Sequence, residues 1–142
     1  MDNIHASCVE FNGKGILLLG KSGSGKSDIT LRLIENFGAK LVADDRTNIT
    51  VKNNQIIASC PSNILGLLEV RGIGLVKFQF KPETKIDIVI NLVDNFSQIE
   101  RMPQKKYWEY QGVKIKNIDI YPFEESAIYK IKLACDENLQ VY

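Results

Sequence analysis

The segment at residues 20–27, Gly-Lys-Ser-Gly-Ser-Gly-Lys-Ser, constrains this chain more than any other part of its sequence. It fits the pattern G-x-x-x-x-G-K-[ST], in which a glycine-rich turn joins a strand to a helix. An apolar run at residues 15–19 precedes the segment, and residues 27–36 follow it with apolar side chains at helical spacing. The sequence therefore predicts a strand, a phosphate-binding loop and a helix, in that order.

The residue types in this loop suit the binding of a phosphate chain. Glycines let the backbone turn sharply and direct its amides inward, and the N-terminus of the following helix adds a partial positive charge. Lys26 is expected to reach the β and γ phosphates, and Ser27 to place its hydroxyl on Mg²⁺. The motif indicates a nucleoside triphosphate or a related phosphate, but it does not separate a kinase from an ATPase or a GTPase. The predicted nucleotide-binding residues are Gly20, Lys21, Ser22, Gly23, Ser24, Gly25, Lys26 and Ser27.

The composition is that of an ordinary globular protein. The chain has 142 residues, 44% of them hydrophobic and 25% charged, which predicts one domain spanning residues 1–142. A net charge of +1 argues against a nucleic-acid partner. No apolar run approaches the roughly 20 residues that span a bilayer, and the N-terminus lacks the features of a signal peptide. We therefore expect no membrane partner, a cytoplasmic location, and reduced thiols at the scattered cysteines 8, 60 and 135.

The remaining apolar runs predict many short strands and few helices. Strand signals occur at residues 8–11, 40–43, 47–51, 55–59, 67–70, 85–93, 107–110 and 113–118. Asn12-Gly13 and Asn53-Asn54 predict hairpin turns. Gly38 is expected to end the first helix, and Ser126 to begin a second one over residues 126–136, after a loop at residues 95–106. This pattern favours a mixed α/β sheet over a fully alternating, doubly wound fold.

A phosphate-binding loop needs an acidic residue at the end of a neighbouring strand, to hold Mg²⁺ or to activate the nucleophile. Two positions qualify: Asp44, followed by Asp45, ends the strand at residues 40–43, and Asp94 ends the strand at residues 85–93. Two adjacent acids after a buried strand point in different directions, so one can face the nucleotide while the other anchors the loop. Either position could also be a structural turn, and the residues alone leave the choice open.

Three further charged or titratable residues have two interpretations each. Glu69 interrupts an apolar strand, and Arg71 is expected on the same strand face, so the two could neutralise each other. In the functional alternative, Glu69 binds Mg²⁺ and Arg71 contacts a phosphate. The only histidine, His5, is either a solvated or capping residue near the N-terminus or a contact of the transferred phosphate.

Taken together, His5, residues 20–27, residues 42–45 and residues 68–74 resemble the catalytic domain of HPr kinase/phosphorylase. The resemblance extends from His5 to about Val76. It implies a P-loop kinase-like mixed β-sheet with few helices, similar to the PEP carboxykinase-like catalytic domain. It also implies an ATP- and Mg²⁺-dependent kinase for a serine of HPr, the phosphocarrier of the sugar phosphotransferase system. The length resembles the short form that lacks the family's N-terminal domain, and the family's hexamers make a homo-oligomer an expectation.

The resemblance also implies roles for single residues. His5 matches the active-site histidine, and Lys26 matches the lysine of the phosphate loop. Ser27 and Glu69 match the Mg²⁺ ligands. Asp44 matches the acid that accepts the seryl proton and returns one in the reverse reaction, which leaves Asp94 as a structural strand end.

Two arginines complete the catalytic residues that the resemblance implies. Arg71 belongs to the matching stretch at residues 68–77, which the family uses in both directions of the reaction. Arg101 is the nearest match to a catalytic arginine that full-length members carry further along the chain.

The second half of the chain departs from the family's pattern. Residues 117–123 lack the basic residues and the glycine of the loop that the family uses in dephosphorylation, which puts phosphorylase activity in doubt. The same absence leaves open a nucleotide-sensing module without turnover. A small-molecule kinase or plain NTPase is a further alternative, because the phosphate loop alone would serve it equally well.

Overall fold

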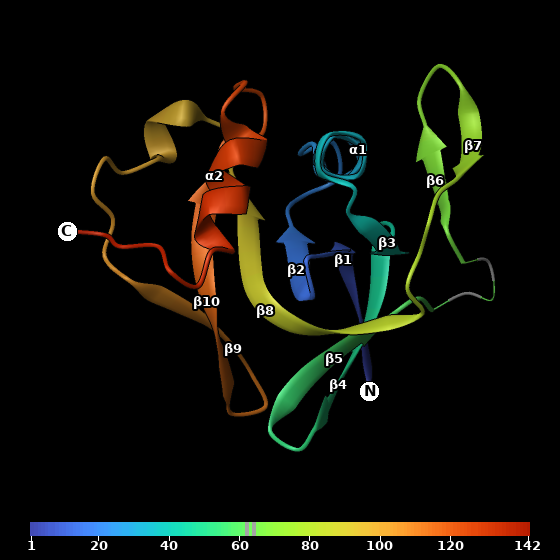
Figure 1. Ribbon diagram of the computed structural model, residues 1–142, viewed down its shortest axis with the longest axis horizontal. Helices are drawn as coiled ribbons and strands as arrows, with labels where there is room; N and C mark the ends of the chain where they lie inside the picture. The colour runs from blue at the N-terminus through green and yellow to red at the C-terminus, as the bar shows by residue number, and fades with distance from the viewer. Residues whose placement is uncertain (62, 64) are drawn as a thin grey trace.

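The computed structural model describes residues 1–61, 63 and 65–142, and Figure 1 shows its helices and strands. The elements along the chain are β1 (Asp2–Phe11), β2 (Lys14–Leu19), α1 (Lys26–Phe37), β3 (Lys40–Ala43), β4 (Arg46–Lys52), β5 (Gln55–Ser59), β6 (Leu67–Val70), β7 (Gly74–Lys77), β8 (Glu83–Leu92), the 3₁₀ helix η1 (Phe96–Gln98), β9 (Lys106–Tyr110), β10 (Val113–Ile120) and α2 (Ala127–Ala134). The predicted mixed α/β fold with few helices is confirmed.

The strands around the phosphate-binding loop lie in the order β3-β1-β2-β8-β10-β9. Strands β2, β8 and β10 run parallel, while β1 runs antiparallel to both β2 and β3. The carboxyl ends of β3, β2, β8 and β10 therefore meet at one edge of the sheet, which is where ligands bind in folds with parallel strands. In Figure 1, β8 and β10 lie on one side of β2, and β1 and β3 lie on the other.

Two long strands bend and close the sheet on itself. Residues 2–5 of β1 pair with β4, whereas residues 6–11 pair with β2. In the same way, β8 pairs with β5 through residues 83–85 and with β2 through residues 86–91. The strands β2, β1, β4, β5 and β8 thus form a closed circuit, and Figure 1 shows β8 curving beneath β2 and β1 to complete it.

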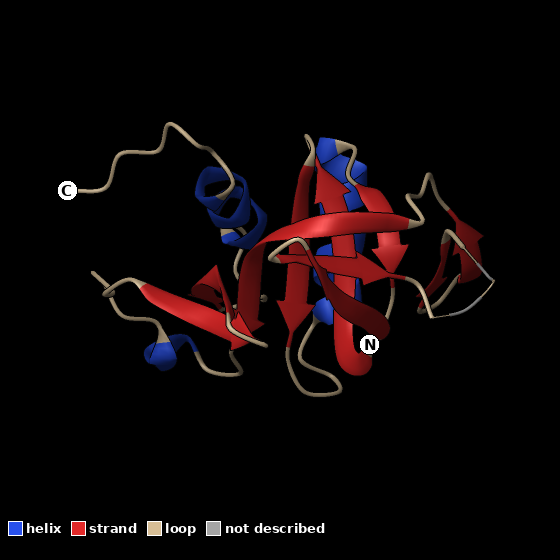
Figure 2. Cartoon of the chain, turned by 90° about the horizontal axis from the view of Figure 1, so that it is seen from below, coloured by secondary structure: helices blue, strands red, loops and turns tan. Residues whose placement is uncertain are grey.

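The alternation of side chains along the strands creates two buried clusters, one on each face of the sheet. On one face, α1 and α2 cover the strands with side chains that include Leu33 and Ile131, which pack near Leu18 and Ile90. On the other face, β4 and β5 contribute Ile49, Ile56 and their neighbours. Figure 2 shows strands crossing in front of α1, and the chain after α2 leading away from the body.

Several local predictions are confirmed by the backbone. Asn12 and Gly13 have φ values of 50° and 79°, and Asn53 and Asn54 have values of 52° and 60°, as two-residue hairpin turns require. Gly38 ends α1 in the left-handed conformation, with φ 69°, and its N–H donates to the Ile34 carbonyl.

Other element boundaries differ from the predictions because of long-range pairing. β1 starts at Asp2, six residues earlier than expected, since its polar N-terminal half pairs with β4. β7 was not predicted; it pairs with β6 to form a separate two-stranded sheet. Within the expected loop, residues 96–98 form a 3₁₀ turn capped by the Asn95 side chain. Ser126 occupies the N-cap position of α2, but its side chain makes no capping hydrogen bond.

The described part of the chain contains no helix that is both long and apolar enough to cross a membrane. Cys8 lies in the core and Cys135 is half-buried, and neither forms a disulfide within the described residues. Burial raises the pKa of both thiols, that of Cys135 to about 11. Neither thiol is therefore set up as a nucleophile.

Candidate active site

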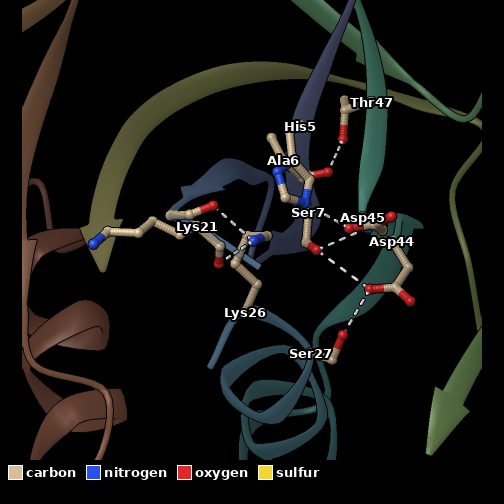
Figure 3. A network of polar contacts seen from close by, with 10 residues as sticks. His5, Ala6, Ser7, Lys21, Lys26, Ser27, Asp44, Asp45 and Thr47 are labelled. Atoms are coloured by element: carbon tan, nitrogen blue, oxygen red, sulfur yellow. Dashed lines mark hydrogen bonds and ion pairs between the residues drawn. The ribbon is translucent and has the colours of Figure 1, made fainter. Parts of the chain in front are cut away.

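The phosphate-binding loop has a fixed internal geometry. The Ser24 N–H donates to the Lys21 carbonyl at 3.0 Å. Lys26 folds back across the loop, and its Nζ donates to the carbonyls of Gly20 at 2.7 Å and Lys21 at 2.9 Å (Figure 3). The Lys26 residue is only 5% exposed, and burial lowers its pKa. The lysine is therefore held in the loop by carbonyl oxygens that a phosphate group can replace.

A cleft of about 680 Å³ opens over this loop. It is lined by Ser22, Gly23, Gly25, Lys26, Ser27, Asp28, Leu31, Asp44, Asp45, Leu68, Glu69, Val70, Arg71 and Phe123. The phosphate loop and both predicted Mg²⁺ ligands thus share one cavity with the acidic pair that follows β3. Most residues that the sequence singled out are brought together here from three separate parts of the chain.

The two adjacent acids point to different partners, as predicted. Asp44 Oδ1 accepts hydrogen bonds from the Ser27 hydroxyl at 3.1 Å and from the Ser7 hydroxyl at 3.3 Å. Asp45 Oδ1 lies 2.7 Å from His5 Nε2. Burial raises the pKa of Asp44, and the two hydroxyl donors oppose that effect without cancelling it. His5 therefore contacts the acid that anchors the turn, not the acid that faces the loop.

Strand β1 holds this turn in place through its backbone and Ser7. The Ser7 hydroxyl accepts a hydrogen bond from the Asp45 N–H at 3.0 Å while it donates to Asp44. The Ala6 N–H donates to the Asp45 carbonyl at 3.0 Å, and Asp45 has a left-handed φ of 66°. Ser7 is fully buried, and the sequence analysis did not identify it. Its signal was a polar residue inside an apolar strand, the same signal that drew attention to Glu69.

Glu69 and Arg71 both line the cleft, but not from one strand face. Strand β6 ends at Val70, so Arg71 lies in the turn that leads to β7. The prediction that they share a strand face is therefore wrong. The charge of Glu69 contributes to the raised pKa of Asp44, which places the two carboxylates in the same electrostatic environment.

Asp94 lies on the opposite side of the loop, two residues beyond β8. Its Oδ2 is 3.1 Å from Lys21 Nζ, and the two side chains are 60% and 82% exposed. The Lys21 hydrogen bond lowers the pKa of Asp94. Figure 3 shows the Lys21 side chain extending away from Lys26. Asp94 thus pairs with the loop's surface and does not line the cleft.

Arg101 lies in the bend between η1 and β9, where it is exposed. It is not among the residues that line the cleft. The structure thus leaves Arg101 apart from the other predicted catalytic residues, and its role stays a prediction.

The donor atoms in the cleft fit a phosphate chain and a hard cation. Gly23 has a φ of 78° with open space around its Cα, as a loop that surrounds phosphate oxygens requires. Ser24 Oγ is buried and has no hydrogen-bond partner in the described structure. Ser27, Asp44 and Glu69 offer the oxygen ligands that Mg²⁺ prefers. Within the described residues, no group of three or more His, Cys, Asp or Glu side chains is arranged to hold a metal ion.

Phe123 is a cleft residue that the sequence analysis missed. It follows β10 in the segment where the sequence departs from the family's pattern, and it is 59% exposed. The available signal was a large aromatic residue next to a proline in a turn, which by itself indicates nothing about a ligand.

Comparison with known proteins gives a consistent result. The profile of the family described as "HPr Serine kinase C-terminal domain" matches residues 1–131. The HPr kinase/phosphorylase of Lactobacillus acidophilus is 39% identical over 130 residues, which cover 84% of this chain and 40% of the relative. That of Malacoplasma penetrans is 36% identical over 123 residues, covering 79% and 40%. The chain thus matches about 40% of the length of these curated relatives.

A solved structure agrees with the sequence relatives. The HPr(Ser) kinase/phosphatase from Coxiella burnetii superposes with a TM-score of 0.80 at 25% identity. The match covers 93% of this chain and 92% of that one. The predicted catalytic fold is therefore matched over nearly its whole extent.

Proposed function

Because the chain belongs to the HPr serine kinase C-terminal domain family, we propose that it transfers a phosphoryl group from ATP to a serine of an HPr-like phosphocarrier. The observation that carries this proposal is the position of Asp44. Its carboxylate lies in the same cleft as Lys26 and Ser27, and it accepts a hydrogen bond from the Ser27 hydroxyl. An acid beside a phosphate loop is placed to receive the proton of an incoming hydroxyl. The proposal implies a cytoplasmic protein, where ATP and the carrier occur.

The residues of the cleft divide the work of transfer. ATP supplies the phosphoryl group, and Mg²⁺ spreads its negative charge. Ser27 and Glu69 would hold the metal ion, and the loop amides and Lys26 would bind the phosphates. To do so, Lys26 exchanges its bonds to the Gly20 and Lys21 carbonyls for phosphate oxygens.

Asp44 would orient the serine hydroxyl and take its proton. Its raised pKa, caused first by burial, makes it a stronger base than an exposed aspartate. His5 acts through Asp45, whose carboxylate it contacts, and so fixes the turn that presents Asp44. Arg71, in the turn that follows β6, lines the cleft and would contact a phosphate group there.

The test uses the purified chain, Mg-ATP and the HPr-like carrier encoded by the same genome. We expect the intact mass of the carrier to rise by one phosphate, mapped to a serine. Lys26→Ala is the control, and it should abolish the gain because charge stabilisation at the phosphates is lost. A gain that persists in Lys26→Ala would place the nucleotide elsewhere and contradict the proposal.

Two further outcomes of the same experiment have separate meanings. If ATP binds but no carrier is modified, the result favours a nucleotide-sensing module over a kinase. If phosphorylated carrier forms, adding inorganic phosphate tests the reverse reaction, which we expect to be slow because residues 117–123 lack basic side chains. Light scattering of the same sample tests the expected hexamer.

A further inference from the structure

Three aromatic side chains form a row beside the phosphate loop. Phe96 and Tyr121 meet edge to face with ring centroids 6.0 Å apart, and Tyr121 and Phe123 do so at 5.7 Å. Phe123 ends the row and lines the cleft together with Gly25 and Lys26. Its ring is largely exposed there, at 59%. An exposed aromatic face next to a phosphate site is suited to stack on a planar ligand group.

The segment that carries Phe123 is fixed while the ring stays exposed. Arg32 of α1 donates hydrogen bonds to the carbonyls of Pro122 and Glu124. Pro122 packs against the phosphate loop, since a Cβ added at Gly25 would lie 3.0 Å from Pro122 Cβ and 3.5 Å from the Phe123 ring. A ring on a fixed backbone loses little freedom when a ligand stacks on it, so less of the interaction is offset by ordering.

The order of the strands gives the cleft a direction. Asp44 follows β3, two strands from β2 on one side, and Phe123 follows β10, two strands from β2 on the other. The phosphate loop, which follows β2, therefore lies between Asp44 and Phe123. A nucleotide whose terminal phosphate points toward Asp44 can extend its other end toward β10, where Phe123 lines the same cleft.

From these observations we infer that Phe123 is the platform on which the base of the bound nucleotide stacks, an inference that rests on the proposed function. The ligand group is an aromatic nucleobase. Stacking uses the π-face that every base has, so this contact adds affinity without choosing between adenine and guanine. Phe123 thus separates nucleoside triphosphates from inorganic phosphate chains, which bind the loop alone.

The experiment compares two ligands on the full chain by titration calorimetry with Mg²⁺: ATP and inorganic tripolyphosphate. Phe123→Ala should weaken ATP binding by about 5- to 150-fold, the range expected for the loss of one base–aromatic stack. Tripolyphosphate affinity should be unchanged, and GTP should lose as much affinity as ATP. Phe123→Trp, which keeps an aromatic face, should retain the affinity for ATP.

Tyr107→Ala is the matched control, because Tyr107 is 57% exposed on β9 and does not line the cleft. It should change neither affinity. Unchanged ATP affinity in Phe123→Ala would overturn the inference. An equal loss of affinity for ATP and for tripolyphosphate would also overturn it, because Phe123 would then support the conformation of the phosphate loop. If the wild-type protein binds neither ATP nor tripolyphosphate, the proposed function itself is overturned. This result differs from the two outcomes that overturn only the inference about Phe123.

Discussion

Two aspartates flank the phosphate-binding loop in opposite surroundings. Asp44, on the β3 side, is partly buried and accepts hydrogen bonds from two hydroxyls, and burial raises its pKa. Asp94, on the β8 side, is exposed and paired with Lys21, and that hydrogen bond lowers its pKa. In the sequence, both are acids that follow an apolar strand. Their neighbours, not their residue type, shift the two pKa values in opposite directions, and this difference supports the proposal that Asp44 is the base.

Replacing Asp44 should have the largest effect. Asp44→Asn keeps the side chain's shape and its ability to accept the two hydroxyl hydrogen bonds, but it cannot take a proton. We expect phosphoryl transfer to the carrier to fall by about 10²- to 10⁴-fold, the usual contribution of a general base. ATP affinity, measured by calorimetry, should remain. Turnover close to that of the wild type would remove Asp44 from the role of base.

Removing the Ser7 hydroxyl should have an intermediate effect, visible mainly in the pH profile. The Ser7 hydrogen bond lowers the pKa of Asp44, so Ser7→Ala should raise that pKa further. Asp44 acts as a base only when ionised, so the acidic limb of the transfer rate should move to higher pH. The shift should be resolved in rate profiles recorded across the acidic range, because hydrogen bonds to charged groups are stronger than those between neutral groups.

Two variants separate this effect from a general loss of structure. Ser7→Thr retains a hydroxyl and should leave the pH profile in place. Glu69→Gln should lower the rate, because Glu69 is a proposed Mg²⁺ ligand, but it also removes a charge that raises the pKa of Asp44, so the acidic limb should move to lower pH. If Ser7→Ala and Glu69→Gln shift the acidic limb of the transfer rate in the same direction, that limb does not reflect the ionisation of Asp44.

Replacing Asp94 should have the smallest effect. An exposed ion pair contributes little free energy, so Asp94→Asn should change the transfer rate by less than about twofold. The rate at neutral pH, measured beside Asp44→Asn, is the direct check. A loss for Asp94→Asn as large as that for Asp44→Asn would reverse the assignment of the two acids.

The sequence predicted the parts of the site that depend on local patterns. The phosphate loop at residues 20–27 is recognisable because its function requires glycines, a lysine and a hydroxyl at fixed spacing. Asn12-Gly13 and Gly38 were predictable because their left-handed conformations favour those residue types. The acidic pair at residues 44–45 followed from its position after a buried strand.

The parts that were missed depend on contacts between distant segments. Ser7 gains its significance only because β1 pairs with β3 and brings it beside the Asp44–Asp45 turn. Phe123 reaches the cleft because β10 and β2 both pair with β8, on opposite sides of that strand. No local sequence pattern encodes this arrangement. Strand β6 of the β6–β7 hairpin was predicted, but its partner β7 was missed because Gly72 and Gly74 interrupt the alternation that identifies strands.

That hairpin has a consequence for how the molecule opens. Among the described residues, strands β6 and β7 pair only with each other, whereas β2 is held between β1 and β8 in the closed circuit. An isolated two-stranded unit is marginally stable, and local unfolding requires less free energy than global unfolding wherever few hydrogen bonds cross to the rest of the fold. Amide hydrogens near Glu69 should therefore exchange with solvent well before those of β2. The protein thus presents one proposed metal ligand on a hairpin outside the main sheet, and the phosphate loop next to a strand that is paired on both sides.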